Sequence, residues 1–442
     1  MTAVVVGGGL AGCEAAWALA TRGVDVTLFE MRPAVRTPAH QTDRLAELVC
    51  SNSFKSLELS NAHGLLKAEL RHLGSLLLEC AELARVPGGA ALAVDRDIFS
   101  RLVHERVTSH SRINVVREEV RDIPSPAVIA TGPLTSEALT GALTRRLGAD
   151  ALAFYDAIAP VVSSESLDHG RLYALSRYGK GDGDDYLNAP MDAEAYATFI
   201  DALLSADQFT AHEFDQVPYF EGCLPVEEMA RRGRETLRFG PMKPVGLPEP
   251  ATGREPFAVV QLRREDRAGQ MWNLVGFQTR LRIPEQRRVF SMIPGLEQAE
   301  FLRFGSIHRN AYLNSPACLG EALTLKDDDR VFIAGQMTGV EGYTESLGTG
   351  LVAGINLARR LSGQPVTVPP PTTMLGGLYR YLREADPRHF QPMNANFGLL
   401  DPLGDGQMGR GQDGRVRRSK ERKKELLVER AQADFERWVA AL

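Results

Sequence analysis

The feature that most constrains the fold is a glycine-rich turn that follows a short apolar run at the N-terminus. Residues 3–6 are Ala-Val-Val-Val, as in a buried parallel strand, and residues 7–12 then place glycines at the GxGxxG spacing. The pattern of 13–22 predicts a helix, and 24–29 predicts a second strand that ends at Glu30. This order of strand, glycine turn, helix, strand and acid predicts a Rossmann-type dinucleotide-binding unit within an α/β fold.

Each part of this turn has a chemical reason. The first two glycines let the backbone turn tightly and approach a pyrophosphate, and the third lets helix and strand pack closely. The helix N-terminus faces the phosphate charge, and Glu30 is placed to accept hydrogen bonds from a ribose diol. FAD and NAD fit this motif equally well. The residues predicted here to bind the dinucleotide are Gly7, Gly8, Gly9, Leu10, Ala11, Gly12 and Glu30.

Two distant segments favour FAD over NAD. Residues 128–132 predict a strand that runs into a small turn, and residues 331–335 predict another, followed by a glycine-rich loop and an apolar helix. Both resemble later signatures of the glutathione-reductase-like FAD-binding fold, in which the last signature places a helix N-terminus near the flavin. The resemblance adds further predicted cofactor-binding residues, namely Gly132, Gly335, Gln336, Tyr343, Gly348 and Gly350.

The return of an FAD signature at residue 331 predicts a discontinuous cofactor domain. We expect this domain to comprise residues 1–150 and 311–442, with an inserted α+β substrate domain over residues 151–310. A chain of 442 residues is long enough for this arrangement. Its content of 44% hydrophobic and 24% charged residues is ordinary for a globular protein.

Cysteine usage and hydropathy indicate the compartment. The five cysteines lie far apart without a CxxC pair, which argues against a disulfide framework and a thiolate zinc site, so no metal is expected. No apolar run is long enough to cross a bilayer, and the N-terminus lacks the basic region of a secretory signal. These features predict a cytoplasmic protein with reduced thiols and no membrane partner.

Several longer motifs outside the cofactor signatures point to one family. They lie at residues 50–53 (Cys-Ser-Asn-Ser), 220–228, 239–247, 275–279, 293–296 and 308–310. With these motifs the chain resembles, over nearly its whole length, the TrmFO family of folate- and FAD-dependent tRNA (uracil-54, C5)-methyltransferases. The related GidA/MnmG flavoproteins, which modify the wobble uridine, differ by a much longer C-terminal helical region and by a glycine-rich stretch around position 50.

The resemblance implies a reaction at carbon 5 of a uracil. This carbon is a poor nucleophile until a thiolate adds to carbon 6, so such an enzyme needs a cysteine with a lowered pKa. Cys223 matches the family's nucleophile, and it lies just ahead of a predicted helix whose N-terminus favours a thiolate. Glu221, Glu227 and Glu228 oppose that effect, and from the residues alone burial in a core is the commoner fate of a cysteine.

By resemblance, Cys50 is the second catalytic residue and lies close to the flavin. Two roles stay open for it, removal of the carbon-5 proton and protection of the reduced flavin. The resemblance also implies 5,10-methylenetetrahydrofolate as the carbon donor and FAD as the reductant, with NADH or NADPH restoring the reduced flavin. His308 would stack on the pterin and Arg282 would face the active site, and Gln278 and Lys243 complete the predicted substrate contacts.

A strongly basic segment near the C-terminus predicts an RNA partner. Residues 415–424 hold seven basic side chains and one glutamate, in a chain whose net charge is −5. Such a density suits a phosphate backbone, and the resemblance implies the tRNA T-arm. The tRNA contacts predicted from this segment are Arg417, Arg418, Lys420, Lys423 and Lys424. A second positive region is expected from Arg263, Arg264, Arg267, Arg280, Arg282, Arg287 and Arg288.

Three other functions compete with uridine-54 methylation. A GidA/MnmG-like enzyme would modify the wobble uridine instead. A flavin oxidoreductase acting on a small metabolite would need neither the basic segment nor two reactive thiols. An FAD-stabilised RNA-binding protein or tRNA chaperone would keep the basic surface and tolerate loss of Cys223. The sequence is compatible with a monomer and with a homodimer.

Overall fold

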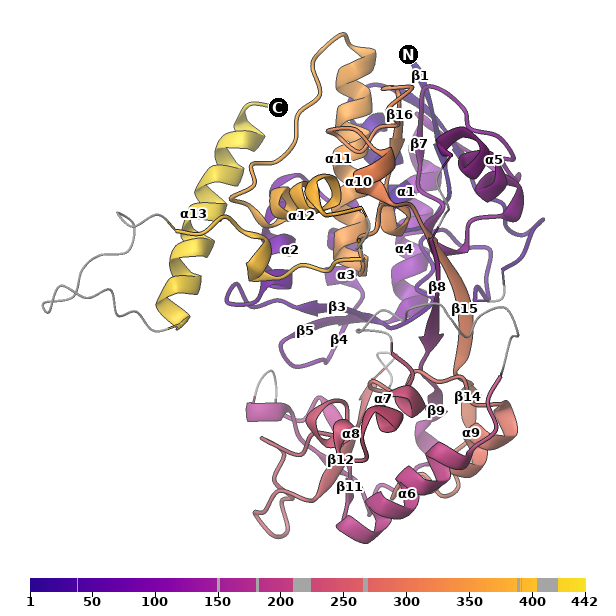
Figure 1. The fold of residues 1–442 in the computed structure, drawn as a ribbon, viewed down its shortest axis with the longest axis vertical. Coiled ribbons are helices and arrows are strands. Elements are labelled where there is room, and N and C mark those ends of the chain that lie inside the picture. The colour runs from indigo at the N-terminus through magenta and orange to yellow at the C-terminus, as the bar shows by residue number, and fades with distance from the viewer. Residues whose placement is uncertain are drawn as a thin grey trace, which may run out of the picture.

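The chain folds into two halves, each with its own sheet, as Figure 1 shows. The computed structural model describes residues 1–37, 39–148, 152–179, 183–209, 224–264, 269–387, 390, 392–403 and 420–442. Its description includes side chains except at residues 152–158, 306–310, 420 and 421. The upper half in Figure 1, the parallel half, contains a five-stranded parallel sheet. The lower half, the antiparallel half, contains a six-stranded antiparallel sheet.

The parallel sheet has the strand order β16-β7-β1-β2-β6. The strands are β1 Thr2–Val6, β2 Asp25–Phe29, β6 Ile113–Val116, β7 Ala127–Ile129 and β16 Val331–Ile333. β1 is central, since its Val4 pairs with Thr27 on one side and with Ala127 on the other. β1, β7 and β16 contain short apolar runs, as is typical of parallel strands covered on both faces, whereas buried and more exposed residues alternate along β2. The observed sheet confirms the α/β, Rossmann-type fold class that the glycine turn predicts.

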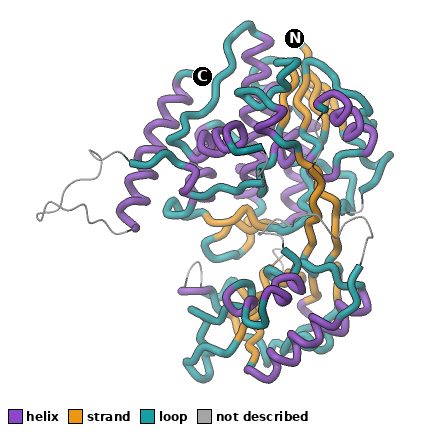
Figure 2. Tube along the Cα trace, viewed as in Figure 1, coloured by secondary structure: helices purple, strands orange, loops and turns teal. Residues whose placement is uncertain are grey.

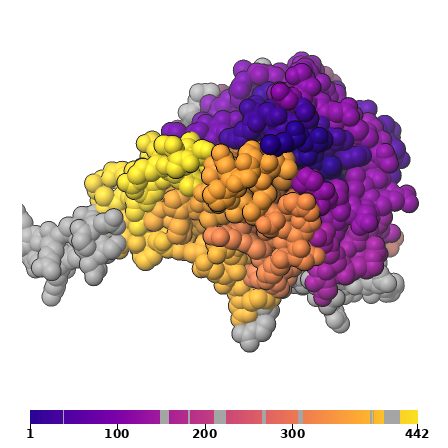
Figure 3. All heavy atoms as spheres, turned by 90° about the horizontal axis from the view of Figure 1, so that it is seen from above, coloured from indigo at the N-terminus to yellow at the C-terminus, as the bar shows by residue number. Residues whose placement is uncertain are grey.

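Two helices from opposite ends of the chain pack tightly on this sheet. They are α1 Leu10–Ala20 and α11 Tyr343–Leu361. A Cβ atom added to Gly350 would lie 2.2 Å from the Ala11 carbonyl oxygen, and one added to Gly354 would lie 2.6 Å from that of Ala15. Glycine is therefore required at both positions for the two helix backbones to approach this closely. Figure 3 shows the resulting neighbourhood, with indigo N-terminal and orange C-terminal segments side by side.

The remaining helices of the parallel half cover the sheet and a small three-stranded sheet of order β3-β5-β4. Buried Glu69 of α2 accepts hydrogen bonds from Met374 N (2.7 Å) and Leu375 N (2.8 Å), and so caps α12. Burial raises the pKa of Glu69 to about 8. The elements are β3 Ser53–Ser56, β4 Arg85–Val86, β5 Ala91–Val94, α2 Ala62–His72, α3 Leu76–Leu83, α4 Arg96–Ser109, η1 Gly132–Leu134, α5 Glu137–Leu147, α10 Ser315–Cys318, η5 Gly335–Thr338, α12 Met374–Glu384, η6 Phe397–Leu399 and α13 Lys420–Ala440.

The antiparallel half has the strand order β10-β11-β12-β13-β9-β14. Its core is separate from that of the parallel half and includes the edge-to-face pair Phe277 and Phe290. Figure 2 shows its strands in orange beside purple helices. The elements are β9 Val161–Ser163, η2 Ser164–Ser166, β10 Tyr173–Ala174, η3 Arg177–Gly179, β11 Tyr186–Met191, α6 Ala193–Ser205, α7 Val226–Arg232, α8 Thr236–Phe239, β12 Ala258–Arg264, β13 Met271–Leu274, α9 Ile283–Phe290 and β14 Phe301–Arg303.

A two-stranded antiparallel ribbon connects the halves. It pairs β8 Leu152–Ile158 with β15 Ser306–Tyr312, and Figure 1 shows it running from one half to the other. The domain boundary expected at residue 310 lies inside β15. The proposed division into residues 1–150 with 311–442 and residues 151–310 stays a prediction.

Two further properties concern membranes and metals. Among the described helices, none is long and apolar enough to span a bilayer. Within the same described residues, no cluster of three or more His, Cys, Asp or Glu side chains is placed to hold a metal ion.

Candidate active site

The glycine turn after β1 leaves room for a ligand at one position and serves the backbone at two others. A Cβ atom at Gly7 would lie 2.6 Å from the Ala130 carbonyl oxygen, and one at Gly12 would lie 1.8 Å from that of Gly7. At Gly9, by contrast, no described atom would lie within 4 Å. Gly9 caps α1, and no described side chain bonds to the first backbone N–H groups of this helix. These N–H groups and the open space suit the pyrophosphate of a dinucleotide.

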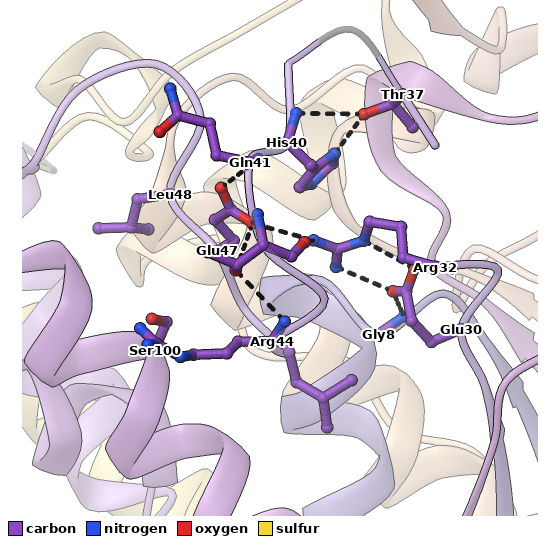
Figure 4. A network of polar contacts seen from close by, with 12 residues as sticks. Gly8, Glu30, Arg32, Thr37, His40, Gln41, Arg44, Glu47, Leu48 and Ser100 are labelled. Atoms are coloured by element: carbon purple, nitrogen blue, oxygen red, sulfur yellow. Dashed lines mark hydrogen bonds and ion pairs between the residues drawn. The ribbon is translucent and has the colours of Figure 1, made fainter. Parts of the chain in front are cut away.

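Glu30 is buried in a network that Figure 4 shows. Its Oε2 accepts from Gly8 N (3.1 Å) and Arg32 Nη2 (3.1 Å), and its Oε1 accepts from Arg32 N (3.0 Å) and Nε (2.9 Å). Burial by itself raises the pKa of Glu30, but the hydrogen bonds and charge of Arg32 outweigh burial and lower it. A carboxylate offers about four acceptor sites. A ribose diol would therefore have to share Glu30 with Arg32, a residue that the motif did not predict.

Two adjoining cavities open beside this network. The first, about 70 Å³, is lined by the glycine turn, Glu30 and Arg32. The second, about 610 Å³, lies along the N-terminus of α5 and shares Met31 and Ser136 with the first. Together they give the nucleotide end of a long cofactor both a polar anchor and space.

The later FAD signatures divide into ligand-facing and packing positions. Gln336 and Tyr343 line a central cavity described below. Gly132 has a φ of +66° and no described atom within 4 Å of a Cβ position, and Gly335 has a φ of +70° beside Ala11. Gly350 packs against α1, and a Cβ at Gly348 would lie 2.8 Å from Leu375 Cδ1. The last two therefore lie where helices pack, and neither lines the central cavity or the two cavities beside Glu30.

The central cavity has a volume of about 300 Å³ and lies between the two halves. It brings together four predicted site residues, Cys50, Gln278, Gln336 and Tyr343. The parallel half contributes Cys50, Ser51, Ser53, Lys55, Gln336, Glu341, Gly342, Tyr343, Ser346 and Asn394 to its lining. The rest of the lining is Ala159, Arg263, Asn273, Val275, Gly276 and Gln278. Its volume is within the range of ligand-binding clefts, and its lining is rich in amide and charged groups.

Three elements that are distant in sequence hold the backbone of Cys50. The Tyr343 hydroxyl, at the start of α11, accepts from Cys50 N (3.0 Å) and Ser51 N (3.0 Å) and donates to the Ser51 carbonyl (2.8 Å). Arg96 of α4 donates to the Cys50 carbonyl at 3.0 Å, and Arg303 of β14 donates to it at 3.4 Å. Burial raises the pKa of the Tyr343 phenol well above its usual range, so it stays a neutral donor. Both halves thus determine where Cys50 lies.

Asn52 joins the same loop to the antiparallel sheet. Its buried side-chain amide donates to the Val94 carbonyl (3.0 Å) and the Arg264 carbonyl (2.6 Å). Its amide oxygen accepts from Arg263 Nε at 2.8 Å. Because each hydrogen-bonding group of a buried amide is expensive to leave unmatched, this contact ties β12 firmly to the Cys50 loop.

Gln278 is held from behind by α7. Its carbonyl accepts from Val226 N at 2.7 Å. Buried Glu227 accepts from Thr279 Oγ1 (2.9 Å) and Arg280 N (2.6 Å). Burial raises the pKa of Glu227, and the hydrogen bonds from the Arg280 backbone and Thr279 oppose that rise. The chain that follows Cys223 is therefore tied to a wall of the central cavity.

The other predicted substrate residues lie away from this cavity or outside the description. Arg282 is exposed at the N-cap of α9, and Lys243 is half-buried in the loop after α8. His308 lies in β15 opposite Asp156, and its side chain is outside the described residues. Cys223, Arg417 and Arg418 also lie outside the described residues, as does the side chain of Lys420. Their predicted roles stay predictions.

The arginines expected to form a second positive region are mostly engaged within the chain. Arg280 pairs with Glu228, and Arg288 pairs with Glu285 at 2.5 Å. Arg264 lies over Trp272 and Arg287 over Phe304, at 5.5 and 5.0 Å from the ring centroids. Arg263 is buried against Asn52, and Arg267 lies outside the described residues. Arg280 and Arg288 are thus paired with carboxylates, whereas the contacts of Arg263, Arg264 and Arg287 leave their charge in place. The second positive region stays a prediction.

Lysines of α13 are exposed as the sequence predicts. Lys423 and Lys424 lie on its solvent side, and Lys424 Nζ is 5.6 Å from the Phe397 ring centroid. The opposite side of the helix buries Leu427, Ala431 and Phe435 against the parallel half. The helix is thus amphipathic and leaves its basic N-terminal turns available.

Three cysteines are poor candidates for chemistry. Cys13, Cys80 and Cys318 are buried, and burial raises the pKa of each thiol, that of Cys80 to about 12. A thiol with a raised pKa is protonated near neutral pH and is a weak nucleophile. Among the cysteines with a described position, Cys50 is the one that lines the central cavity.

Comparisons with known proteins identify the family. The family model described as glucose inhibited division protein A matches residues 2–365. A Geobacter sulfurreducens relative named methylenetetrahydrofolate–tRNA-(uracil-5-)-methyltransferase TrmFO is 56% identical, over 99% of this chain and 99% of the relative. A Thermus thermophilus protein of the same name is 54% identical, over 99% and 96%. The chain belongs to the TrmFO family.

The structural comparison agrees with this assignment. GidA from Aquifex aeolicus superimposes with a TM-score of 0.68 at 16% identity, covering 100% of this chain and 74% of that one. At that identity the likeness shows a shared fold and no more. The resemblance to TrmFO, within the GidA-related superfamily, is confirmed, and the TrmFO assignment is favoured over the wobble-uridine alternative.

Several residues of this TrmFO site were not predicted from the motifs. Asn52, Arg96, Arg303 and Arg32 lie outside the glycine signatures. Arg96 and Arg303 bond the Cys50 carbonyl and Arg32 bonds Glu30, whereas Asn52 bonds Arg263 and Arg264. Asn52 lies within the Cys-Ser-Asn-Ser motif, so its place beside Cys50 was a usable signal. The two arginines that bond the Cys50 carbonyl could not be predicted in this way, because the sequence around residues 96 and 303 contains no pattern that indicates a contact with residue 50.

Proposed function

We propose that this enzyme forms 5-methyluridine at position 54 of the tRNA T-loop, with 5,10-methylenetetrahydrofolate as the carbon donor and FAD as its cofactor. NADH or NADPH would keep the flavin reduced, in a reducing cytoplasmic compartment. The observation that carries this proposal is the central cavity, which sets Cys50 beside the flavin-loop residues Gln336 and Tyr343 and opposite the amide of Gln278. The names of the full-length relatives support the same reaction.

The parallel half fits an FAD molecule. The open position at Gly9, the N–H groups of α1 and the Glu30–Arg32 network would hold the pyrophosphate and the adenosine. The central cavity, next to the N-terminus of α11, would hold the flavin ring. When bound and reduced, FAD supplies the hydride that converts an exocyclic methylene into a methyl group.

The residues around the cavity can recognise a uracil and orient it. A uracil presents two carbonyl acceptors that flank one N–H donor. Asn273, Gln278 and Asn394 line the cavity, and each side-chain amide offers both a donor and an acceptor. We refer to the contact between residues 50–52 of the parallel half and β12 and β14 of the antiparallel half as the seam. Because these amides lie on both halves, a uracil held by them would lie across the seam, beside Cys50. We therefore propose these amides as the groups that orient the base.

Cys223 and Cys50 would have different roles in the reaction. Cys223 would add to carbon 6 of the uracil, which makes carbon 5 able to attack the one-carbon donor. Cys50, held by Tyr343, Arg96 and Arg303, would either remove the carbon-5 proton or protect the reduced flavin. The anchoring of Val226 to Gln278 supports an approach of the Cys223 segment to the same cavity.

The decisive experiment is methyl transfer to an unmodified tRNA transcript with label in the methylene carbon of methylenetetrahydrofolate. FAD and NAD(P)H are supplied, and a parallel reaction contains labelled S-adenosylmethionine. We expect label from folate alone, at uridine 54, with no incorporation into a transcript that carries cytidine at this position. Cys223→Ala should abolish transfer. Retention of full transfer by Cys223→Ala, or transfer only from S-adenosylmethionine, would contradict the proposal.

A further inference from the structure

Large hydrophobic side chains are exposed on two neighbouring loops of the antiparallel half. Phe239, Tyr178 and Val245 are 80%, 64% and 41% exposed. Tyr178 lies in η3, and Phe239 and Val245 lie at the end of α8 and in the loop after it. We refer to the two exposed rings, Tyr178 and Phe239, together with the neighbouring Val245, as the aromatic platform. Exposed aromatic rings in adjoining loops are a feature of interaction surfaces.

The loops that carry the platform are held in one conformation. Tyr178 adopts a left-handed backbone (φ 60°, ψ 25°), which costs free energy for a bulky side chain. Its ring lies on Gly246, where an added Cβ would be 2.6 Å from Tyr178 Cε1. The Tyr178 amide donates to the Gly246 carbonyl at 3.3 Å, and Gly246 N donates to Glu255 Oε1 at 2.7 Å.

Arg177 fixes the second loop to the first. Its guanidinium donates to the carbonyls of Val245 and Lys243 and to Gln261 Oε1, the last two at 2.8 and 3.2 Å. The contacts of Tyr178 with Gly246 and of Arg177 with the second loop therefore hold the strained backbone at Tyr178 in a conformation that exposes its ring to solvent. Such rigidity lowers the entropy cost of stacking a partner on the ring.

The loops that carry the platform contact residues that line the central cavity or neighbour its lining. The Gln261 carbonyl accepts from Val275 N at 2.9 Å, and Val275 lines the cavity. Pro241, two residues after Phe239, packs on the cavity wall, since a Cβ at Gly276 would be 2.6 Å from Pro241 Cβ. A nucleotide whose base enters the cavity would therefore place its neighbours in the chain near the platform.

We propose that the aromatic platform stacks the unpaired bases that flank the target uridine in the tRNA loop. This inference rests on the proposed function, because it takes the occupant of the cavity to be a base drawn out of that loop. Every base has a flat face that stacks on an aromatic ring, and single-stranded RNA is recognised chiefly in this way. Lys243 and Arg177 provide positive charge beside the platform for the accompanying phosphates.

The test measures binding of a fluorescently labelled T-arm stem-loop to the FAD-loaded, full-length enzyme at several salt concentrations. We expect Tyr178→Ala to weaken binding about tenfold and Phe239→Ala to weaken it less, whereas Tyr178→Phe keeps the wild-type affinity. Loss of a stacked ring releases no counterions, so the salt dependence of Tyr178→Ala should match that of wild type. Lys243→Ala should instead lower the slope of log K against log salt by about 1.

A second readout reports stacking directly. A stem-loop with 2-aminopurine beside the target uridine should lose fluorescence on binding wild type and Tyr178→Phe, and keep it with Tyr178→Ala. The matched control is Leu83→Ala, which removes a 52% exposed apolar side chain from the parallel half and should change neither readout. Retained FAD absorbance and an unchanged melting temperature establish that each variant is folded.

The possible results separate this inference from the proposed function. Wild-type affinity and quenching in both Tyr178→Ala and Phe239→Ala would overturn the platform while wild type still methylates tRNA from folate. A change in the sedimentation of Tyr178→Ala without RNA would overturn it too, and would make the patch a contact between two copies of the chain. If wild type transfers no carbon to tRNA, the proposed function itself fails.

Discussion

The two halves of the molecule contribute to the site in different ways. In the parallel half the nucleotide position is shaped mainly by backbone, since a Cβ at Gly12 would collide with the Gly7 carbonyl while Gly9 stays open. In the antiparallel half the cavity wall is made of side chains, including Asn273, Gln278 and Arg263. A cofactor common to many enzymes needs only N–H groups and space, whereas a specific base needs amides in a set geometry. Under the proposed function, this difference would give cofactor binding mainly to the parallel half and recognition of the base mainly to the antiparallel half.

At the seam the two halves depend on each other. Cys50 belongs to the parallel half, yet its carbonyl accepts a hydrogen bond from Arg303 of the antiparallel half. Asn52, two residues on, bonds to both Arg263 and Arg264. The position of the candidate catalytic thiol therefore depends on how the two halves are arranged, and substitutions there should affect catalysis without affecting FAD binding.

The largest effect is expected from Cys50→Ala. We expect methyl transfer from labelled folate to fall by roughly 10³-fold, while FAD absorbance is retained, because the nucleotide end of FAD would be held at the glycine turn, which Cys50 does not line. Cys318→Ala, which changes a buried thiol that does not line the central cavity, should keep the wild-type rate. Full activity in Cys50→Ala would contradict a catalytic role for Cys50.

The same variant separates the two roles left open for Cys50. Reduced flavins react with oxygen, so a protective thiol is needed only in air. Recovery of transfer under anaerobic conditions would indicate protection of the flavin. Loss that persists without oxygen would indicate removal of the carbon-5 proton.

The next effect contrasts two glycines of the same turn. Gly12→Ala would force a Cβ to 1.8 Å from a carbonyl oxygen, so we expect a loss of about 3 kcal/mol or more in unfolding free energy, measured by urea titration. Gly9 has an extended backbone that alanine adopts, and open space at its Cβ position. Gly9→Ala should keep the melting temperature of the apoprotein and weaken FAD binding at least about tenfold in a fluorescence titration. Unchanged FAD affinity in Gly9→Ala would place the pyrophosphate elsewhere.

A smaller effect is expected at the seam. Arg303→Met removes the hydrogen bond from the antiparallel half to the Cys50 carbonyl, and we expect kcat to fall about tenfold with the KM for tRNA and FAD affinity retained. Arg303→Lys should recover part of the loss, and the rate of Cys50 alkylation by iodoacetamide should change in step with kcat. The control is Arg171→Met, an exposed arginine of the same half that pairs with Glu297. Equal kcat values for wild type and Arg303→Met would mean that the halves act independently.

The smallest effect concerns a buried charge in the parallel half. Burial lowers the pKa of Lys67 from 10.5 to about 7, although its Nζ donates to the carbonyls of Ser56 (2.9 Å) and His63 (3.0 Å). Between these two pH values the unfolded chain binds more protons than the folded chain, so stability rises with pH. Unfolding free energy from urea titration should increase more steeply with pH in wild type than in Lys67→Met, by up to about 1.4 kcal/mol per pH unit. Lys326→Met, at an exposed lysine, should leave the slope unchanged. Equal slopes in wild type and Lys67→Met would mean that Lys67 titrates alike in both states.

Motifs predicted local structure well and contacts between distant elements poorly. The strand, turn and helix at residues 2–20 follow from an apolar run and glycine spacing, which act over neighbouring residues. Gly348 and Gly350 were predicted as cofactor-binding, yet both lie where helices pack, because glycine serves close helix packing and close ligand approach equally well. Tyr343 was predicted for its place in the flavin loop, and its hydroxyl in fact bonds to Cys50 and Ser51.

What the sequence by itself determined is the family, the fold class and the identity of the glycine turn, since each depends on residue types at fixed spacing. Only the tertiary structure decided which side chains meet at the seam. Cys50 meets Tyr343 and Arg303 across 293 and 253 residues of chain, through a parallel sheet completed by a late strand and an antiparallel sheet inserted before it. The same packing pairs Arg280 and Arg288 of the middle region with glutamates and buries Arg263 against Asn52. Hydrogen bonds and ion pairs reach only a few ångströms, so their partners are chosen by the packing of sheets and helices and not by spacing along the chain.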